Sequence, residues 1–160
     1  MSIDSADFRR VMGRFATGVT VATAALPDGR RVGLTVNSFV SVSLTPPLVL
    51  FCLHETSVAQ DVFGQATHYA INILAQDQEA VSRAFAQRGQ GAERWQSCTS
   101  RLGISGAPLL EGALATIECK ITQRISAGDH TILLGEVVHL QAHEGTPLLY
   151  WSSSYRKFVG

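Results

Sequence analysis

The sequence predicts a mainly β protein, a closed or nearly closed antiparallel β-barrel with at most three helices. Short runs of strand character are separated by turns and do not alternate regularly with helices, which argues against a doubly wound sheet. The clearest alternation of apolar and polar residues lies at positions 113–122. A chain of 160 residues fits a single domain, residues 1–160, whose core needs no metal or disulfide.

An amphipathic helix is predicted near the N-terminus by an apolar stripe with the i, i+3, i+4, i+7 spacing. The stripe consists of Phe8, Val11, Met12 and Phe15. Ser5 is the expected N-cap, and we expect this helix to plug the sheet. Residues 19–23 and 31–35 are then expected to pair as a hairpin, because a Pro-Asp-Gly turn lies between them.

The segment 33–53 places small polar side chains inside an otherwise apolar strand pattern. In strand geometry alternate residues share a face, so one face is expected to pack and the other to bind. The packing face holds Val36, Val40, Val42 and Leu44, and the binding face holds Thr35, Asn37, Ser41 and Ser43. Nine residues are too long for one straight strand beside a small ligand, so we expect a bend near Phe39, with a second strand at 48–53.

The remaining elements follow from turn and helix signals. Residues 54–57 are expected to form a loop before a short helix through Phe63, with Ser57 as its candidate cap. A strand at 69–74 precedes a helix that begins at Asp77 and ends at Gly89-Gln90-Gly91. Residues 113–122 are expected to pair with 130–141 across a hairpin turn at 126–129, and a short strand lies around 148–151.

Charge and cysteine content limit the possible partners. Lys+Arg and Asp+Glu both number 13, so a nucleic-acid-binding surface is not expected. There is also no apolar run long enough to span a membrane. Low charge combined with 46% hydrophobic residues favours association into a homodimer. Cys52, Cys98 and Cys119 are widely spaced and residues 1–15 carry several charges, which together indicate a reducing, cytoplasmic location.

One string of residues, together with a later turn, resembles a known family. The string is T-V-N-S-F-x-S-V-S-L-x-P-P at positions 35–47, and the turn is Gly128-Asp129-His130. Both resemble the flavin reductase family, the reductase components of two-component flavin-dependent monooxygenases, and the resemblance covers nearly the whole chain. It implies the FMN-binding split β-barrel and an NAD(P)H:flavin oxidoreductase. Such an enzyme transfers hydride from NADH or NADPH to FMN or FAD and supplies reduced flavin to a separate monooxygenase.

The residue types in the string suit a flavin. A flavin phosphate needs hydroxyl groups and backbone amides, for which Ser41, Ser43 and Ser57 are the candidates. The ring needs hydrogen bonds at its pyrimidine edge and an apolar surface. Thr35, Val36, Asn37 and Ser38 offer both. A single Ser or Thr in a strand usually has no binding role, so the prediction of a flavin site depends on the whole string.

The resemblance also suggests which residues lie near the nicotinamide. In similar proteins the G-D-H segment borders the flavin ring, so His130 is the expected catalytic residue, positioning the hydride donor by a hydrogen bond from its imidazole. Asp129 either stabilises the turn or orients His130. Phe85 matches the family's F-A segment, and Tyr155 lies in the segment that closes the nicotinamide side, although Ser153 and Ser154 stand where the family often has glycine. Both aromatic residues are equally consistent with core packing.

The sequence gives little support to other classes of function. No G-x-G-x-x-G or P-loop motif is present, and Gly103–Ala107 lacks the second glycine of a nucleophile elbow. His139 and His143 share a strand face but have no further partners, so a solvated strand end is favoured and no metal is expected. The alternatives are a flavin-dependent reductase of a corrinoid or metal chelate, a non-catalytic flavin- or haem-binding module, and a pyridoxine-phosphate oxidase, which the serine-rich string disfavours.

Overall fold

The computed structural model describes residues 3–89 and 91–159, and its central feature is one antiparallel sheet. The strand order in this sheet is β3-β2-β6-β9-β10-β5-β4. Its strands are β2 Thr20–Ala25, β3 Arg31–Val36, β4 Val40–Leu44, β5 Pro47–His54, β6 His68–Ile73, β9 Ala115–Ala127 and β10 His130–Ala142. The mainly β, antiparallel fold with few helices is therefore confirmed, including the β2–β3 and β9–β10 hairpins.

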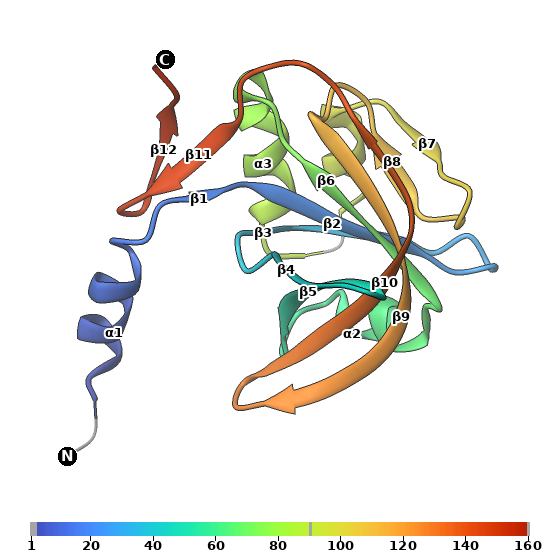
Figure 1. Ribbon diagram of the computed structural model, residues 1–160, viewed down its shortest axis with the longest axis horizontal. Coiled ribbons are helices and arrows are strands. Elements are labelled where there is room, and N and C mark those ends of the chain that lie inside the picture. The colour runs from blue at the N-terminus through green and yellow to red at the C-terminus, as the bar shows by residue number, and fades with distance from the viewer. Residues whose placement is uncertain (1–2, 90, 160) are drawn as a thin grey trace.

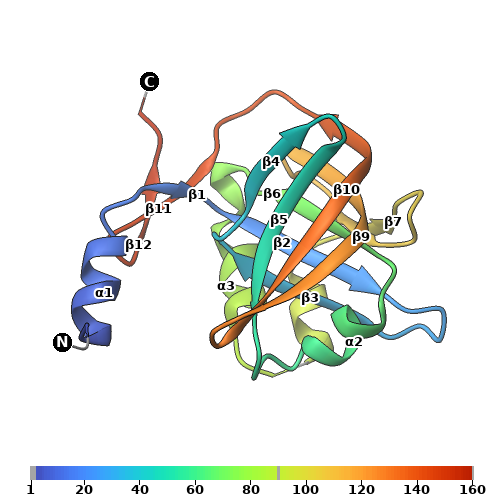
Figure 2. The ribbon, with the colours of Figure 1, turned by 60° about the horizontal axis from the view of Figure 1, so that its bottom comes forward.

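The sheet coils around the largest of three clusters of buried side chains found among the described residues. Figure 2 shows β5 and β10 crossing in front of β2 and β3. Val32 and Val36 of β3 and Phe51 and Leu53 of β5 belong to the same cluster of buried side chains. Yet β3 and β4 stand at opposite ends of the strand order, so in the described part of the chain no hydrogen-bonded ladder joins these two strands. Packing of these buried side chains holds the two ends of the sheet together.

The predicted bend near Phe39 is present. β3 ends at Val36 and β4 begins at Val40, with residues 37–39 outside both strands. The prediction for the apolar face of β4 was wrong for this chain taken alone, because Val40 and Val42 are 49% exposed and Leu44 is 93% exposed. A register shift against β5 between Ser41 and Ser43 also breaks the predicted alternation. β4 is an edge strand, and the described residues leave its apolar side chains largely exposed.

Two short helices bury apolar side chains, each in a different cluster. α2 Gln60–Gln65 buries Val62 and Phe63. α3 Glu79–Ala86, which follows the one-turn η1 Gln76–Gln78, buries Val81 and Phe85. The apolar stripe that predicted this helix packs it against β3, as Figure 1 shows, and the 3-10 turn η2 Ala92–Ser97 lies next to it. The helix ends at Ala86, before the predicted glycine stop, and Gln90 of that stop lies outside the described residues.

The N-terminal helix differs from its prediction. α1 Ser5–Met12 is capped by Asp4, whose side chain accepts a hydrogen bond from the backbone N–H of Ala6, and Ser5 is the first helical residue. None of its residues is buried. In Figure 1 it projects away from the sheet, next to the small sheet of β1 Thr17–Gly18, β11 Leu148–Trp151 and β12 Ser154–Lys157. The helix therefore does not plug the sheet, and its apolar stripe is exposed.

A further hairpin covers the outer surface of β6 and β9. It consists of β7 Ser100–Leu102 and β8 Pro108–Leu110. The buried Glu118 of β9 holds its loop, since one carboxylate oxygen accepts hydrogen bonds from the backbone N–H and the hydroxyl of Ser105 at 2.7 and 2.6 Å. The fully buried Asn72 of β6 holds its second strand by accepting a bond from the N–H of Leu110.

Between residues 3 and 159, Gln90 apart, there is no helix with the length and apolar character needed to cross a membrane.

Candidate functional site

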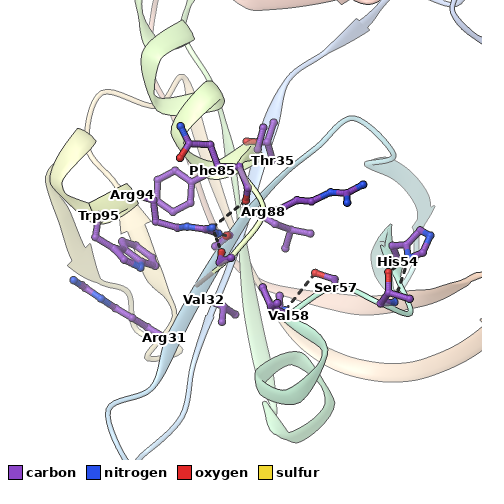
Figure 3. Close-up of a pocket in the computed structure, with 17 residues that line it drawn as sticks. Arg31, Val32, Thr35, His54, Ser57, Val58, Phe85, Arg88, Arg94 and Trp95 are labelled. Atoms are coloured by element: carbon purple, nitrogen blue, oxygen red, sulfur yellow. Dashed lines mark hydrogen bonds between the residues drawn. The ribbon is translucent and has the colours of Figure 1, made fainter. Parts of the chain in front are cut away.

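A pocket of about 440 Å³ opens beside β3, and we call it the β3 pocket. It lies between β3, the loop after β5 and the segment from the end of α3 into η2 (Figure 3). Its polar lining includes Arg31, Thr35, His54, Thr56, Ser57, Arg88 and Arg94. Its apolar lining includes Val32, Leu34, Val58, Phe85 and Trp95. Cationic groups, hydroxyls and aromatic rings in one concave site suit an anionic ligand that carries a planar ring.

The aromatic side of the pocket depends on a glycine. A Cβ atom placed on Gly33 would lie 2.5 Å from Cε1 of Phe85, so only glycine permits this approach of α3 to β3. The Phe85 ring is buried and meets Trp95 edge to face, with ring centroids 5.0 Å apart. Trp95 in turn lies under the Arg31 guanidinium, whose carbon is 4.3 Å from the ring centroid. Together these contacts give the pocket a rigid aromatic wall with a cation at its edge.

Arg94 fixes the loop that closes one side of the pocket. Its guanidinium donates hydrogen bonds to the carbonyl oxygens of Gly33, Gln87 and Gly89, which ties the segment after α3 to β3 (Figure 3). Burial lowers the pKa of Arg94, because desolvation disfavours the charged form. Because the Arg94 guanidinium donates its hydrogen bonds to backbone carbonyls, its main role is to hold this loop in place. The exposed Arg31 and Arg88 remain accessible to a ligand.

The loop after β5 supplies the hydroxyl side of the pocket. Its turn is closed by a hydrogen bond from the N–H of Ser57 to the carbonyl of His54. The Ser57 hydroxyl oxygen accepts a bond from the N–H of Ala59 at 3.3 Å. Since α2 begins at Gln60 and Ala59 is its N-cap, Ser57 stabilises the preceding turn and is not the cap of the helix, which corrects that prediction.

Next to this loop, one carboxylate lies between two imidazoles. Asp129 Oδ1 is 2.7 Å from Nδ1 of His130, and Asp129 Oδ2 is 3.6 Å from Nε2 of His54. The hydrogen bond from His130 is the main cause that holds the pKa of Asp129 below its usual value. His54 lines the β3 pocket, and His130 lies beside it with ring centroids 4.9 Å apart.

The structure brings some of the predicted site residues together and separates others. Thr35, Ser57 and Phe85 line the β3 pocket. Asn37 and Ser38 line a different pocket of about 660 Å³ that α1 and β1 border. The side chain of Val36 is buried in the core. Ser41 and Ser43 lie on β4, on either side of a register shift against β5.

Tyr155 connects the C-terminal hairpin to α3. Its hydroxyl is 2.7 Å from the hydroxyl of Ser82, and the carbonyl of Ser82 accepts a hydrogen bond from the Thr35 hydroxyl at 2.7 Å. Tyr155 also lies under the Arg83 guanidinium and lines a separate pocket with it. Ser82 of α3 therefore links Tyr155 to Thr35, and both were predicted as site residues.

Several lining residues were not predicted from the sequence: Arg31, His54, Arg88, Arg94 and Trp95. His54 ends an apolar strand and stands directly before a polar turn, and this was the one local signal available. Arg31 lies on β3 itself. Arg88, Arg94 and Trp95 follow no such pattern, because only the packing of α3 on β3, with η2 next to it, brings them to the pocket. Over residues 3–89 and 91–159 there is no group of three His, Cys, Asp or Glu side chains arranged to hold a metal ion.

These features define a class of protein, an antiparallel β protein with a nucleotide-sized cationic and aromatic pocket on an edge strand. Comparison with known proteins identifies the family within this class. The sequence model of the family described as flavin reductase like domain matches residues 12–158, and the chain belongs to that family.

Individual relatives agree with this assignment. The chain is 40% identical over 157 residues to the FMN reductase (NADH) SmoA of Agrobacterium fabrum, covering 97% of this chain and 87% of the relative. It is 38% identical over 157 residues to the reductase component of a 4-nitrophenol 4-monooxygenase/4-nitrocatechol 2-monooxygenase of Rhodococcus opacus, covering 98% and 83%. The NADH:FAD oxidoreductase SgcE6 of Streptomyces globisporus, solved with NAD and FAD fragments, superposes with a TM-score of 0.90 at 37% identity, covering 99% and 97%.

Proposed function

We propose that this protein is an NADH-dependent flavin reductase that binds the flavin nucleotide, FMN or FAD, in the β3 pocket. The observation that carries the proposal is the composition of that pocket, in which Arg31, Arg88 and the hydroxyl of Ser57 surround an apolar and aromatic surface. A phosphate needs the cations and hydroxyls, and a flavin ring needs the apolar surface. The relatives named above support the choice of ligand and of NADH as its reductant.

The described residues fit such a ligand. A volume of about 440 Å³ lies within the range of small-molecule sites, roughly 300–1,000 Å³. Arg31 and Arg88 would neutralise phosphate charge, and Ser57 would donate a hydroxyl hydrogen bond. We further propose that the sheet is a split β-barrel of the FMN-binding type, with Asn37, Ser38, Ser41 and Ser43 extending the site past the end of β3.

The bound flavin would supply the redox chemistry by accepting hydride from the nicotinamide. The chain's own residues would bind the flavin and orient the nicotinamide. His130 would position the nicotinamide, because its hairpin borders the pocket next to His54. Phe85 and Trp95 form a wall that excludes water from one side of the site. Proximity and orientation of this kind lower a barrier by about 7–11 kcal/mol at most.

We also propose two kinds of protein partner. A separate monooxygenase would receive the reduced flavin, as the names of relatives such as the Rhodococcus opacus reductase component suggest. A second copy of the chain would cover the exposed apolar side chains of α1 and β4, where Val11 is 58% and Leu44 93% exposed. The homodimer is tested by measuring the mass of the protein in solution by light scattering.

Two further expectations accompany this function. A single domain over residues 1–160 is supported by the family match, which spans residues 12–158. A cytoplasmic location is supported by Cys52, Cys98 and Cys119, which are all free thiols rather than parts of a disulfide.

The reductase activity is tested by mixing the protein with NADH and excess FMN or FAD without oxygen and following the flavin absorbance. Loss of absorbance over many turnovers is expected, at a rate well above that of a protein-free mixture. A reductase of a bound second substrate would reduce only one equivalent of flavin. A non-catalytic module would quench flavin fluorescence on binding and leave the absorbance unchanged, and either result contradicts the proposal.

A further inference from the structure

His54 and His130 occupy opposite positions at the end of the β5–β10 ladder. The backbone N–H of Glu55 donates a hydrogen bond to the carbonyl of Asp129 at 2.9 Å, which fastens the β9–β10 turn to the end of β5. The two imidazoles are therefore held as a cross-strand pair, with an angle of 71° between their rings. Figure 3 places His54 at the edge of the β3 pocket, on the loop that also carries Ser57.

The hydrogen bonds around His54 determine which of its nitrogens carries the proton. The backbone N–H of Thr56 points at Nδ1 of His54 at 3.1 Å, and an N–H group can only donate. Nδ1 is therefore the accepting nitrogen, and the neutral imidazole of His54 carries its hydrogen on Nε2. This is the nitrogen that faces Oδ2 of Asp129.

The tautomer of His130 follows from the same carboxylate. The lowered pKa of Asp129 keeps its side chain ionised at neutral pH, so Oδ1 can only accept a hydrogen bond. Nδ1 of His130, 2.7 Å away, must therefore donate. In the neutral imidazole this leaves Nε2 as the acceptor, and that atom remains available to a ligand.

We propose that His54 is a positioning residue for His130, acting through Asp129. Through the electrostatic contact of its Nε2–H with Oδ2 at 3.6 Å, which is longer than a hydrogen bond, His54 orients the carboxylate. Oδ1 then fixes His130 in the Nδ1–H tautomer, in which Nε2 is a hydrogen-bond acceptor. Where the nicotinamide binds beside His130, which rests on the proposed function, Nε2 accepts a hydrogen bond from the amide NH2 of the carboxamide. The expectation from sequence alone, in which the imidazole donates, is thereby reversed for neutral His130.

The first test measures the tautomers directly in the full chain, without any substrate. Long-range 1H–15N spectra distinguish protonated from unprotonated imidazole nitrogens at pH 8. We expect the Nε2–H form of His54 and the Nδ1–H form of His130. His54→Ala and Asp129→Asn should both reduce the preference of His130 for Nδ1–H, while His54→Gln, whose amide nitrogen replaces Nε2, should preserve it. The exposed His139 of β10 offers His139→Gln as the matched control, with His130 unchanged.

The second test is kinetic, at saturating flavin. Asp129→Asn should lower kcat/KM for NADH by about tenfold, because it weakens the hydrogen bond that orients His130. His54→Ala should lower it in the same direction but by less, because the His54–Asp129 contact at 3.6 Å is electrostatic. His54→Gln should restore most of it, and the double variant should be no worse than Asp129→Asn alone. Thermal unfolding of each variant separates this effect from loss of folding.

The two tests distinguish the possible failures. An Nε2–H tautomer of His130 in the unmodified protein, or a His130 tautomer unaffected by both substitutions, overturns the role of His54. If the unmodified protein shows no flavin reduction, the proposed function fails, and the tautomer measurement still decides the positioning role. Equal losses in His54→Ala and His54→Gln would also overturn it, because only the alanine variant removes the hydrogen at Nε2.

Discussion

Phe85 of α3 lies directly against the backbone of Gly33 in β3, closer than any side chain at position 33 would permit. A Cβ at Gly33 would be 2.5 Å from Cε1 and 2.7 Å from Cδ1 of the ring, and 3.4 Å from Cγ2 of Thr23. The ring is almost fully buried, so it has no free space into which to retreat. This one contact sets how closely the helix approaches the edge strand that borders the β3 pocket.

Gly33→Ala should therefore move Phe85 and weaken the protein. We expect the free energy of unfolding to fall by about 1–3 kcal/mol, the usual effect of overpacking a core, and flavin affinity to fall with it. Chemical denaturation and flavin titration measure the two effects. Gly64→Ala is the matched control, because nothing lies within 4 Å of a Cβ at that helical position. A Gly33→Ala protein as stable as the control would contradict the importance of this contact.

The fold could be predicted from the sequence where a local pattern determines it. The alternation at residues 113–122 predicted β9, which runs from Ala115 to Ala127, and the stripe of Val81 and Phe85 predicted the buried face of α3. The same reasoning was wrong for α1 and for the valines of β4, since a pattern identifies an apolar face without identifying what covers it. Neither face is covered by the described residues of this chain.

Arg94 should control the loop that follows α3. Arg94→Met removes the donors to the carbonyls of Gly33, Gln87 and Gly89 while keeping an unbranched side chain of similar length. We expect faster proteolysis at residues 87–89 and flavin affinity lower by about tenfold, which corresponds to about 1.4 kcal/mol. Limited proteolysis followed by mass spectrometry, together with flavin titration, measures both effects.

Arg101→Met is a suitable control for this experiment, because Arg101 is exposed on β7, away from the pocket. If proteolysis and flavin binding are the same in both variants, Arg94 does not hold the loop.

The candidate site could be predicted only in part, and the reason is geometric. Thr35 and Ser57 carry hydroxyls inside strand-and-turn patterns, which is a local signal. Arg94 acquires its role from Gly33, 61 residues earlier in the chain. His54 acquires its role from Asp129, which the β5–β10 pairing brings to it. Such contacts depend on tertiary structure and leave no periodicity in the sequence.

Different residues should control flavin binding and hydride transfer. Ser57→Ala and Asn37→Ala should both raise the flavin Kd, by about tenfold each, if one flavin spans the β3 pocket and the bend after β3. His130→Ala should slow single-turnover flavin reduction more than it changes this Kd. Fluorescence titration and anaerobic stopped-flow spectroscopy provide the two measurements. An unchanged Kd in Asn37→Ala would confine the flavin to the β3 pocket, and equal effects of His130→Ala on Kd and rate would exclude the division of roles.

Cys119 should be inert in the folded protein. Burial raises the pKa of its thiol to about 12, so the reactive thiolate is scarce at pH 8. Iodoacetamide labelling with peptide mapping should modify Cys119 only after unfolding in denaturant. Because the unfolded thiol has an ordinary pKa near 9.0, the folded state retains more protons between pH 9 and 12, and stability should fall as the pH rises through that range. Labelling of native Cys119 at pH 8 would contradict its burial.

Asn72 should be among the most sensitive polar positions in the core, because its side chain ties three strands together. Its amide nitrogen donates to the carbonyl of Val21 at 3.0 Å, and its oxygen accepts from the N–H of Leu110 at 2.8 Å. Asn72→Leu keeps the volume but leaves a buried N–H without a partner, so unfolding should become easier by about 1–3 kcal/mol. Denaturant unfolding measures the change, with the exposed Gln141→Leu as control. Because the β7–β8 hairpin loses its tie to β6, hydrogen exchange at Leu110 should also accelerate. Unchanged protection there would mean that packing alone holds the hairpin.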